Sequence, residues 1–347
     1  MSRLSKLIIV VVLVACGITG WMVLGNGTGF SSKTQSFIIA EGRTGKNDVL
    51  NAMEQNQVIS SKALFSLISS PMGIWGKIKP GKYEVKKGQS LLSIARMLKN
   101  GKQANVNLVI NRLRVKEDLA KLISKNFSTD SASVMKYLNS PGMMSSFGVD
   151  TSNVFTLIIP DTYTFYWNTS LDKIMQRLAN AQKAFWQKNG RLKKAERIGF
   201  TPEQVYILAS IVEEETNYDS DKYKIASVYI NRLNKQMPLQ ACPTIKYAMK
   251  DFTLTRIYEK YLFNPSPYNT YRKKGLPPGP ICTPSPKTID IILDAPSTGY
   301  LFFVAKSDFS GYHHFSNNFT EHNQYAKEYQ KALDAYMARK QEKALKP

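Results

Sequence analysis

The chain has 347 residues, of which 43% are hydrophobic and 21% charged, and its formal net charge is +21. This balance is typical of a folded protein with more than one domain and excludes a mainly disordered chain. The lysines are scattered, without an arginine-rich stripe or an aromatic nucleic-acid motif, so we expect no nucleic-acid partner.

The N-terminal segment is predicted to be a membrane anchor. Residues 7–25 carry no charge and are long enough to cross a bilayer as one helix. Arg3 and Lys6 precede them, which favours a cytoplasmic N-terminus and an exported body. We therefore predict that residues 1–25 are a cytoplasmic tip and single-pass anchor in a bacterial inner membrane. Because no cleavage site closes the run, a signal peptide is disfavoured, whereas a lipid-modified Cys16 stays open.

The body after the anchor is predicted to be periplasmic. Its positive charge predicts binding to an anionic partner there, and the candidates are anionic lipid head groups and cell-wall polymer. Residues 26–35 are rich in Gly, Ser, Thr and Lys, which indicates a short tether.

Residues 36–110 are predicted to form a small αβ subdomain. Phe37 to Ala40 favour a strand, and residues 49–53 and 63–68 favour short helices. In the segment GKYEVKKGQSLLSIARMLKNGK, alternating Tyr83 and Val85 predict a strand, followed by a turn at Gly88 and a helix capped by Ser90. This segment resembles the LysM modules that bind peptidoglycan, while a purely structural αβ unit is the alternative.

Residues 111–200 are predicted to be linking helices at the start of a catalytic region. Apolar side chains recur at Leu119 and Leu122, then at Val134 and Leu138, and a long amphipathic stretch follows from Leu171. The remaining residues, 201–347, are predicted to be the catalytic domain.

An acidic helix opens that domain. Thr201 can cap it, Pro202 suits its first turn, and Gln204 can complete a capping box. In the run VYILASIVEEET, Glu215 falls on the same face as Leu208, Ile211 and Val212.

A carboxyl group on that apolar face should be partly desolvated. Desolvation raises its pKa, and the nearby charges of Glu213 and Glu214 add to the rise. A Glu that stays protonated can donate its proton to a leaving group, as cleavage of a glycosidic bond requires. Three acids at a helix end are also commonly a solvated face, so this pattern is weak by itself.

No second carboxylate is placed by the sequence, although an ordinary glycosidase needs one. One carboxyl suffices if the sugar supplies its own nucleophile. The acid protonates the glycosidic oxygen and then, as a carboxylate, removes a proton from a hydroxyl of the same substrate. The product would be an internal anhydro ring.

Five motifs in order resemble the MltG, or YceG-like, endolytic murein transglycosylases. They are LASIVEEET, IASVYINRL, LQACPTIKYAM, SPYNTYRKKGLPPGPICTP, and YLFFVA followed by HFSNNFTEHN. The resemblance covers Ser36 to the end and is densest from Leu208 to Asn323. It implies that Glu215 is the catalytic acid and base, with Glu213 as possible support.

The resemblance also implies candidates for the glycan cleft. These substrate-binding candidates are Gln240, Tyr268, Asn269, Thr270 and Tyr271. Asn269 and Thr270 can equally stabilise a turn, and the Pro-rich stretch 276–280 is expected to shape the cleft as a rigid loop. His314 and His322 match late family positions, where we expect structural roles.

The chain departs from the family pattern at two places. Cys242 stands where the family usually has Asp, and Phe155-Thr156 stands where it usually has Glu-Gly. These changes affect fine substrate contacts and leave the acidic helix intact.

A disulfide between Cys242 and Cys282 is not favoured by the sequence. The three histidines have no spacing typical of a metal site, and neither metal nor organic cofactor is expected.

The expected protein is α+β: a transmembrane helix, a LysM-like αβ subdomain and a mixed catalytic domain. The resemblance implies cleavage of the MurNAc-β-1,4-GlcNAc bond in nascent strands, leaving 1,6-anhydro ends and terminating strand growth. Glycan strands, the inner membrane and peptidoglycan synthases are the implied partners. The rivals are a non-catalytic peptidoglycan-binding scaffold and a hydrolysing glycosidase; a nucleic-acid binder is the most distant.

Overall fold

The computed structural model describes residues 17, 20, 24–254 and 256–345, with side chains up to residue 339. The predicted anchor of residues 7–25 lies almost wholly outside this described part, as does Cys16. Among the described residues, no helix is both long and apolar enough to cross a bilayer.

The chain divides into two compact units. Unit 1 consists of residues 1–108, 124–130 and 164–170, and unit 2 of residues 109–123, 131–163 and 171–347. The division is therefore not a single point in the sequence. The domain ranges given above remain predictions.

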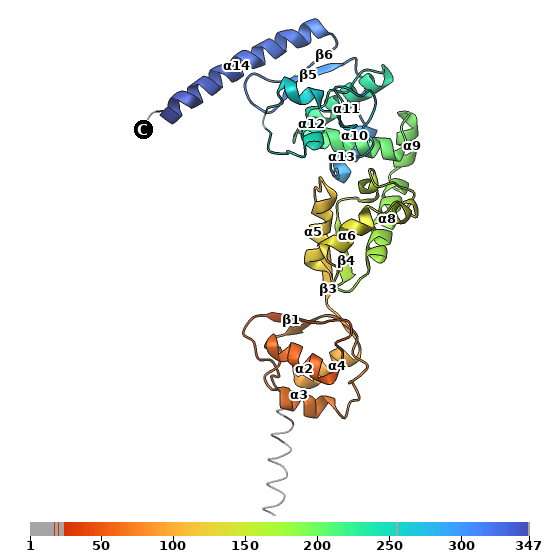
Figure 1. Ribbon diagram of the computed structural model, residues 1–347, viewed down its shortest axis with the longest axis vertical. Coiled ribbons are helices and arrows are strands. Elements are labelled where there is room, and N and C mark those ends of the chain that lie inside the picture. Colours follow the sequence, from red (N-terminus) through yellow and green to blue (C-terminus); the bar gives the residue numbers. More distant parts are fainter. Residues whose placement is uncertain (1–16, 18–19, 21–23, 255, 346–347) are drawn as a thin grey trace, which may run out of the picture. The chain divides into compact units, whose positions relative to one another are not determined.

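Unit 1 is built on an antiparallel pair of strands, β1 (Thr34–Ile39) and β2 (Gly81–Lys86) (Figure 1). Phe37 lies opposite Tyr83 in the register, and their buried rings stack with centroids 5.8 Å apart. The core of the unit is completed by the helices α2 (Lys46–Gln55), α3 (Lys62–Ser69) and α4 (Leu91–Lys99).

The strand, turn and capped helix predicted around Gly88 are confirmed. Gly88 has a φ of +80°, a conformation that glycine adopts without steric cost, and the chain turns there from β2 into α4. Ser90 caps α4 by accepting a hydrogen bond from the backbone N–H of Ser93. The likeness to a LysM module stays a resemblance.

A second two-stranded sheet joins β3 (Asn105–Val109) to β4 (Thr162–Tyr166). In the sequence, these two strands are separated by α5 (Lys116–Asn126), α6 (Ser131–Leu138), α7 (Pro141–Ser145) and the short 3₁₀ helix η1 (Val154–Leu157). The helices predicted here are confirmed, with Leu119, Val134 and Leu138 buried. Phe155 and Thr156 lie buried within η1.

Unit 2 is mainly helical. Its remaining elements are α8 (Leu171–Gln187), α9 (Arg191–Arg197), α10 (Pro202–Glu215), α11 (Asp219–Asn234), α12 (Cys242–Met249), η2 (Glu259–Phe263), α13 (Pro286–Leu293), β5 (Phe302–Ala305), β6 (His313–Ser316) and α14 (Phe319–Leu345). Strands β5 and β6 pair antiparallel, and α14 packs against both (Figure 1). The mixed α+β class is confirmed.

Helix α10 lies at the centre of unit 2. It contacts α9, α11, α12 and α13, and the eight consecutive residues Val205 to Val212 are all buried. A helix that is apolar on all sides is buried on all sides. Its C-terminal acids, Glu213, Glu214 and Glu215, are therefore the first polar side chains that follow a fully enclosed segment.

Candidate active site

The sequence of α10 fixes where its acids emerge. The capping box is present: Thr201 accepts from the backbone N–H of Gln204, whose side chain accepts from the backbone N–H of Thr201. In the buried part, the hydroxyl of Ser210 accepts from the backbone N–H of Ile281 at 3.0 Å. These hydrogen bonds hold the start and the middle of α10 in place. They therefore also set where its last turn, with the three acids, lies.

Glu213 is surrounded by one lysine and two side-chain hydroxyl groups. Its Oε2 accepts from Lys222 Nζ at 2.9 Å, from Ser285 Oγ at 3.2 Å and from the hydroxyl of Thr288. Burial acts to raise the pKa of Glu213, but the bonds from Thr288 and Lys222 and the charge of Lys222 bring it below its ordinary value. Glu213 is therefore an ion-paired carboxylate that joins α10 to α11 and α13.

Glu214 faces two arginines from the segment between β3 and α5. Arg114 forms a two-pronged contact, with Nε at 3.2 Å from Oε1 and Nη2 at 2.9 Å from Oε2. Arg112 Nη1 adds a bond of 3.3 Å to Oε1. Such paired guanidinium contacts fix both oxygens of the carboxylate.

Glu215 has a different environment. Its Oε1 accepts a 2.5 Å hydrogen bond from the hydroxyl of Tyr229 on α11, and none of the ion pairs among the described residues includes it. Burial raises its pKa to about 7, against the Tyr229 bond and the charge of Lys246, while the charge of Glu214 adds to the rise. The predicted desolvation of this carboxyl is confirmed.

Tyr229 is a permanent donor to that carboxyl. Burial, the charge of Glu215 and the hydrogen bond between them raise the tyrosine pKa well above its ordinary value. The hydroxyl therefore keeps its proton at any physiological pH. Because it engages Oε1, the other oxygen of Glu215 has no hydrogen bond to any described residue in the structure.

Two of the predicted cleft motifs meet beside Glu215. Tyr271 places its hydroxyl 3.1 Å from Cys242 Sγ, and the charge of Glu215 contributes to raising the pKa of both groups, after burial. Gln240 has a φ of +52°, and its backbone N–H donates to the carbonyl of Thr270 at 3.0 Å. Its side-chain oxygen accepts from Arg232 at 3.4 Å.

Asn269 and Thr270 lie inside the loop. The Asn269 amide donates to the carbonyls of Leu262 and Asn264 at 2.9 and 2.7 Å. Thr270 Oγ1 accepts from the backbone N–H of Ala241 at 3.0 Å. Both side chains are buried, so the contacts that the structure records for them organise the loop that carries Tyr271.

The Pro-rich segment packs tightly on Tyr268. A Cβ on Gly279 would lie 2.1 Å from the carbonyl oxygen of Ser152 and 3.0 Å from the Tyr268 hydroxyl, so only glycine fits there. Tyr268 also packs on Tyr247, with ring centroids 4.6 Å apart. The loop predicted to be rigid is thus close-packed at Gly279.

The two late histidines each stack on an aromatic ring. His314 stacks on Tyr325 at 4.1 Å and His322 on Phe302 at 5.3 Å, in agreement with the structural roles expected. Cys242 and Cys282 are both free thiols. In the described part of the chain, no three His, Cys, Asp or Glu side chains gather as a metal site.

Comparison with known proteins identifies the family. Residues 37–328 match the YceG-like family. The chain belongs to the YceG-like family. The resemblance seen in the motifs is thereby confirmed.

Curated relatives of this YceG-like chain carry an enzyme name. The endolytic murein transglycosylase of Bacillus subtilis is 28% identical over 331 residues, which are 90% of this chain and 88% of that protein. The endolytic murein transglycosylase of Streptococcus pneumoniae strain D39 is 29% identical over 213 residues, 59% of this chain and 37% of that longer protein.

A solved structure supports the fold of the YceG-like chain. The crystal structure of a yceG-like protein from Listeria monocytogenes has 27% sequence identity and a TM-score of 0.55. The match covers 85% of this chain and 99% of that one.

Sequence reasoning missed several residues of this YceG-like site. Tyr229 lies in the motif IASVYINRL and is buried. A tyrosine on the buried face of a helix needs a partner for its hydroxyl, and this requirement could have indicated its contact with an acid. Nothing in the sequence pointed to Arg112 and Arg114, which lie about a hundred residues before the acidic helix. Lys222 was equally unassigned.

Proposed function

We propose that this chain is an endolytic murein transglycosylase, as its curated relatives are named, with Glu215 as the catalytic acid and base. One observation carries the proposal. Of three adjacent carboxyls, two are ion-paired, and Glu215 alone among them has only a neutral hydroxyl as hydrogen-bond donor and a pKa of about 7. A carboxyl with that pKa can both give and take a proton near neutral pH.

The first step is protonation of the leaving group. Tyr229 engages Oε1 of Glu215, so the proton on the other oxygen points to the substrate. Transfer of that proton to the glycosidic oxygen releases the sugar on the far side of the bond. The Tyr229 bond and the charge of Lys246 stabilise the carboxylate that forms.

The second step uses Glu215 as a base. The carboxylate takes the proton of the C6 hydroxyl of MurNAc while that oxygen bonds to C1, which closes the 1,6-anhydro ring and restores the acid. No second carboxylate is needed. This agrees with the engagement of Glu213 by Lys222 and of Glu214 by Arg112 and Arg114, which leaves neither in the form of a free base.

The bond cut in this proposal is the MurNAc-β-1,4-GlcNAc linkage within nascent strands, so the reaction would end strand elongation. The chemistry favours ring closure over a hydrolysing glycosidase, which requires two carboxyls on opposite sides of the bond. A binding scaffold has no need of a desolvated acid, since burial of an ionisable group without a cation is costly.

Localisation belongs to the same proposal. The uncharged run of residues 7–25 behind Arg3 and Lys6 supports a single-pass inner-membrane protein with a periplasmic body. The resemblance of unit 1 to LysM modules supports contact with peptidoglycan. Peptidoglycan synthases are the expected neighbours, because a strand can be terminated only where it is being made.

Mass spectrometry of cleavage products tests the activity. Full-length wild type, Glu215→Gln and the control Glu203→Gln are incubated in detergent with uncrosslinked murein strands. Glu203 lies on the same helix and pairs with Asn153, so its change tests the fold alone. We expect internal fragments with anhydro ends from wild type and control, and none from Glu215→Gln.

Other products would change the assignment. Fragments heavier by one water would mean hydrolysis. Binding of strands without cleavage by the wild type would favour the scaffold.

A separate experiment tests the membrane anchor. We expect the protein to resist alkaline extraction from membranes and its body to be accessible to protease only from the periplasmic side. Release by alkali would refute the anchor.

A further inference from the structure

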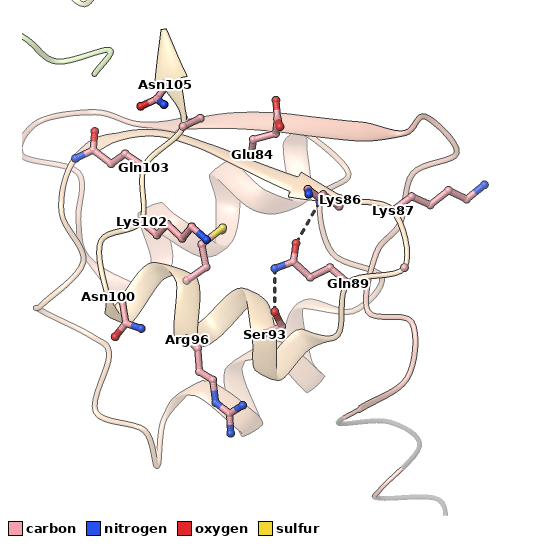
Figure 2. Close-up of a pocket in the computed structure, with 13 residues that line it drawn as sticks. Glu84, Lys86, Lys87, Gln89, Ser93, Arg96, Asn100, Lys102, Gln103 and Asn105 are labelled. Carbon is pink, nitrogen blue, oxygen red and sulfur yellow. Dashed lines mark hydrogen bonds between the residues drawn. The ribbon is translucent and has the colours of Figure 1, made fainter. Parts of the chain in front are cut away.

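Unit 1 contains a groove that the proposed reaction does not use. Its volume is about 920 Å³, and it lies between the end of β2, the exposed side of α4 and the segment that follows α4 (Figure 2). It is formed by residues of unit 1 alone. Its lining residues are Glu84, Lys86, Lys87, Gly88, Gln89, Ser93, Arg96, Met97, Asn100, Lys102, Gln103, Ala104 and Asn105.

The groove is positively charged. Four cations, Lys86, Lys87, Arg96 and Lys102, line it with one acid, Glu84. Among the described residues, none of the four forms an ion pair, although other cations of the chain do. Figure 2 shows Lys102 extending into the space between the strand and the helix. Four unpaired cations around one concavity attract an anionic ligand.

The remaining lining groups indicate what kind of anion fits. The amide side chains of Asn100 and Asn105 offer both donors and acceptors, as a peptide backbone does, whereas Gln103 already donates its Nε2 to the carbonyl of Pro80. Gln89 is already oriented, because its Oε1 accepts from the backbone N–H of Lys86 and its Nε2 donates to Ser93 at 3.0 Å. This chemistry suits a ligand with carboxylates and amides.

The groove does not suit a sugar platform or a lipid surface. No aromatic side chain lines it, whereas in unit 2 Tyr271 lies near Glu215. Pyranose rings are bound best against flat apolar faces of that kind. A bilayer is broad and flat, so it would contact convex cations more readily than cations lining a concave groove.

We propose that this groove binds the carboxylate-bearing stem peptides of murein, so that unit 1 selects peptide-substituted strands over bare glycan. The inference rests on the proposed function, because it takes murein as the substrate. It assigns the glycan to the catalytic unit and the acidic peptide to unit 1.

Binding measurements with full-length protein in detergent test this. All variants carry Glu215→Gln so that strands stay uncut. The groove variant is Lys86→Gln with Lys102→Gln; its matched control is Lys77→Gln with Lys99→Gln, which removes equal charge from exposed lysines of unit 1 outside the groove. The probes are murein strands with intact stem peptides, the same strands stripped of peptides, and a free stem tripeptide with or without amidated carboxylates.

We expect the groove variant to bind intact strands and the free tripeptide about tenfold more weakly, with the control unchanged. Amidation of the tripeptide should weaken its binding to the unaltered groove similarly. Binding of stripped strands should not respond to either variant. Equal weakening by both variants would overturn the proposal in favour of diffuse charge attraction.

Two further probes address other anions. If poly(glycerol phosphate) or vesicles with anionic phospholipid bind the groove and the tripeptide does not, the proposal is wrong. The outcome is separable from the proposed function. Wild-type cleavage with no peptide preference refutes the groove assignment alone, and tripeptide binding without any cleavage refutes the enzyme assignment alone.

Discussion

The Tyr229 hydroxyl donates a 2.5 Å hydrogen bond to Oε1 of Glu215, and this neutral contact distinguishes Glu215 from its two neighbours. Glu213 and Glu214 are each neutralised by cations from other elements. The same three-residue acidic sequence therefore contains two ion-paired carboxylates and one carboxyl whose hydrogen-bond donor is neutral. Packing of the surrounding elements makes that distinction.

Removal of the Tyr229 hydroxyl should impair catalysis and shift its pH dependence. In Tyr229→Phe, the Glu215 carboxylate loses the bond that lowers its pKa, so the pKa should rise above about 7. The high-pH decline in activity should move upward, and the maximal rate should fall roughly ten- to a hundredfold, the worth of a hydrogen bond to a charged group. Rates of murein cleavage across pH measure both.

Tyr206→Phe is the matched control for that change. Its buried hydroxyl bonds the carbonyl of Ile158 at 2.6 Å and does not contact Glu215. This variant should lose stability without a shift in the pH profile. Equal pH profiles for Tyr229→Phe and wild type would contradict the role given to Tyr229.

The raised pKa of Glu215 should appear in stability as well. Between the ordinary carboxyl value of 4.5 and about 7, the unfolded chain gives up this proton while the folded chain still holds it. The free energy of unfolding should therefore fall as pH rises through that window, by up to about 3 kcal/mol.

Glu215→Gln has no such group and should not show this part of the decline. Urea denaturation at pH 5 and pH 8 compares the two proteins. Glu213 acts with the opposite sign, because its pKa is lowered and its stabilisation is lost as pH falls. Identical pH dependence in wild type and Glu215→Gln would show that the carboxyl is not desolvated.

Glu213 should prove to be mainly structural. In Glu213→Gln, Lys222, which is only 6% exposed, loses its anionic partner. The cost in unfolding free energy should be about 3 kcal/mol or more. Cleavage measured well below the unfolding temperature should fall far less than in Glu215→Gln. Adding Lys222→Met should restore part of the stability; a rate loss as deep as that of Glu215→Gln would instead make Glu213 part of the chemistry.

Cys242 offers a test of charge near the acid. In Cys242→Asp, which restores the residue usual in the family, a second carboxylate would lie near Glu215 and raise its pKa further. The high-pH decline in activity should move upward, whereas the neutral control Cys242→Ser should leave it in place. Coincident profiles for the two variants would mean that residue 242 and Glu215 are too far apart to interact.

Local sequence determined much of the fold. Thr201, Pro202 and Gln204 predicted the start of the acidic helix, and the structure has that capping box. Gly88 and Ser90 predicted the turn and cap of α4 in the same way. These signals are readable because they depend on neighbours within one helical turn. The five motifs likewise indicated the family from the sequence alone.

The tertiary structure decided what each acid does. Arg112, Arg114, Lys222 and Tyr229 reach the acids from other elements, and no local pattern records those pairings. Desolvation also depends on what covers a side chain. Periodicity could place Glu215 on an apolar face, but only its burial in the folded chain raised its pKa to about 7 and left it with a neutral hydroxyl, that of Tyr229, as its hydrogen-bond donor.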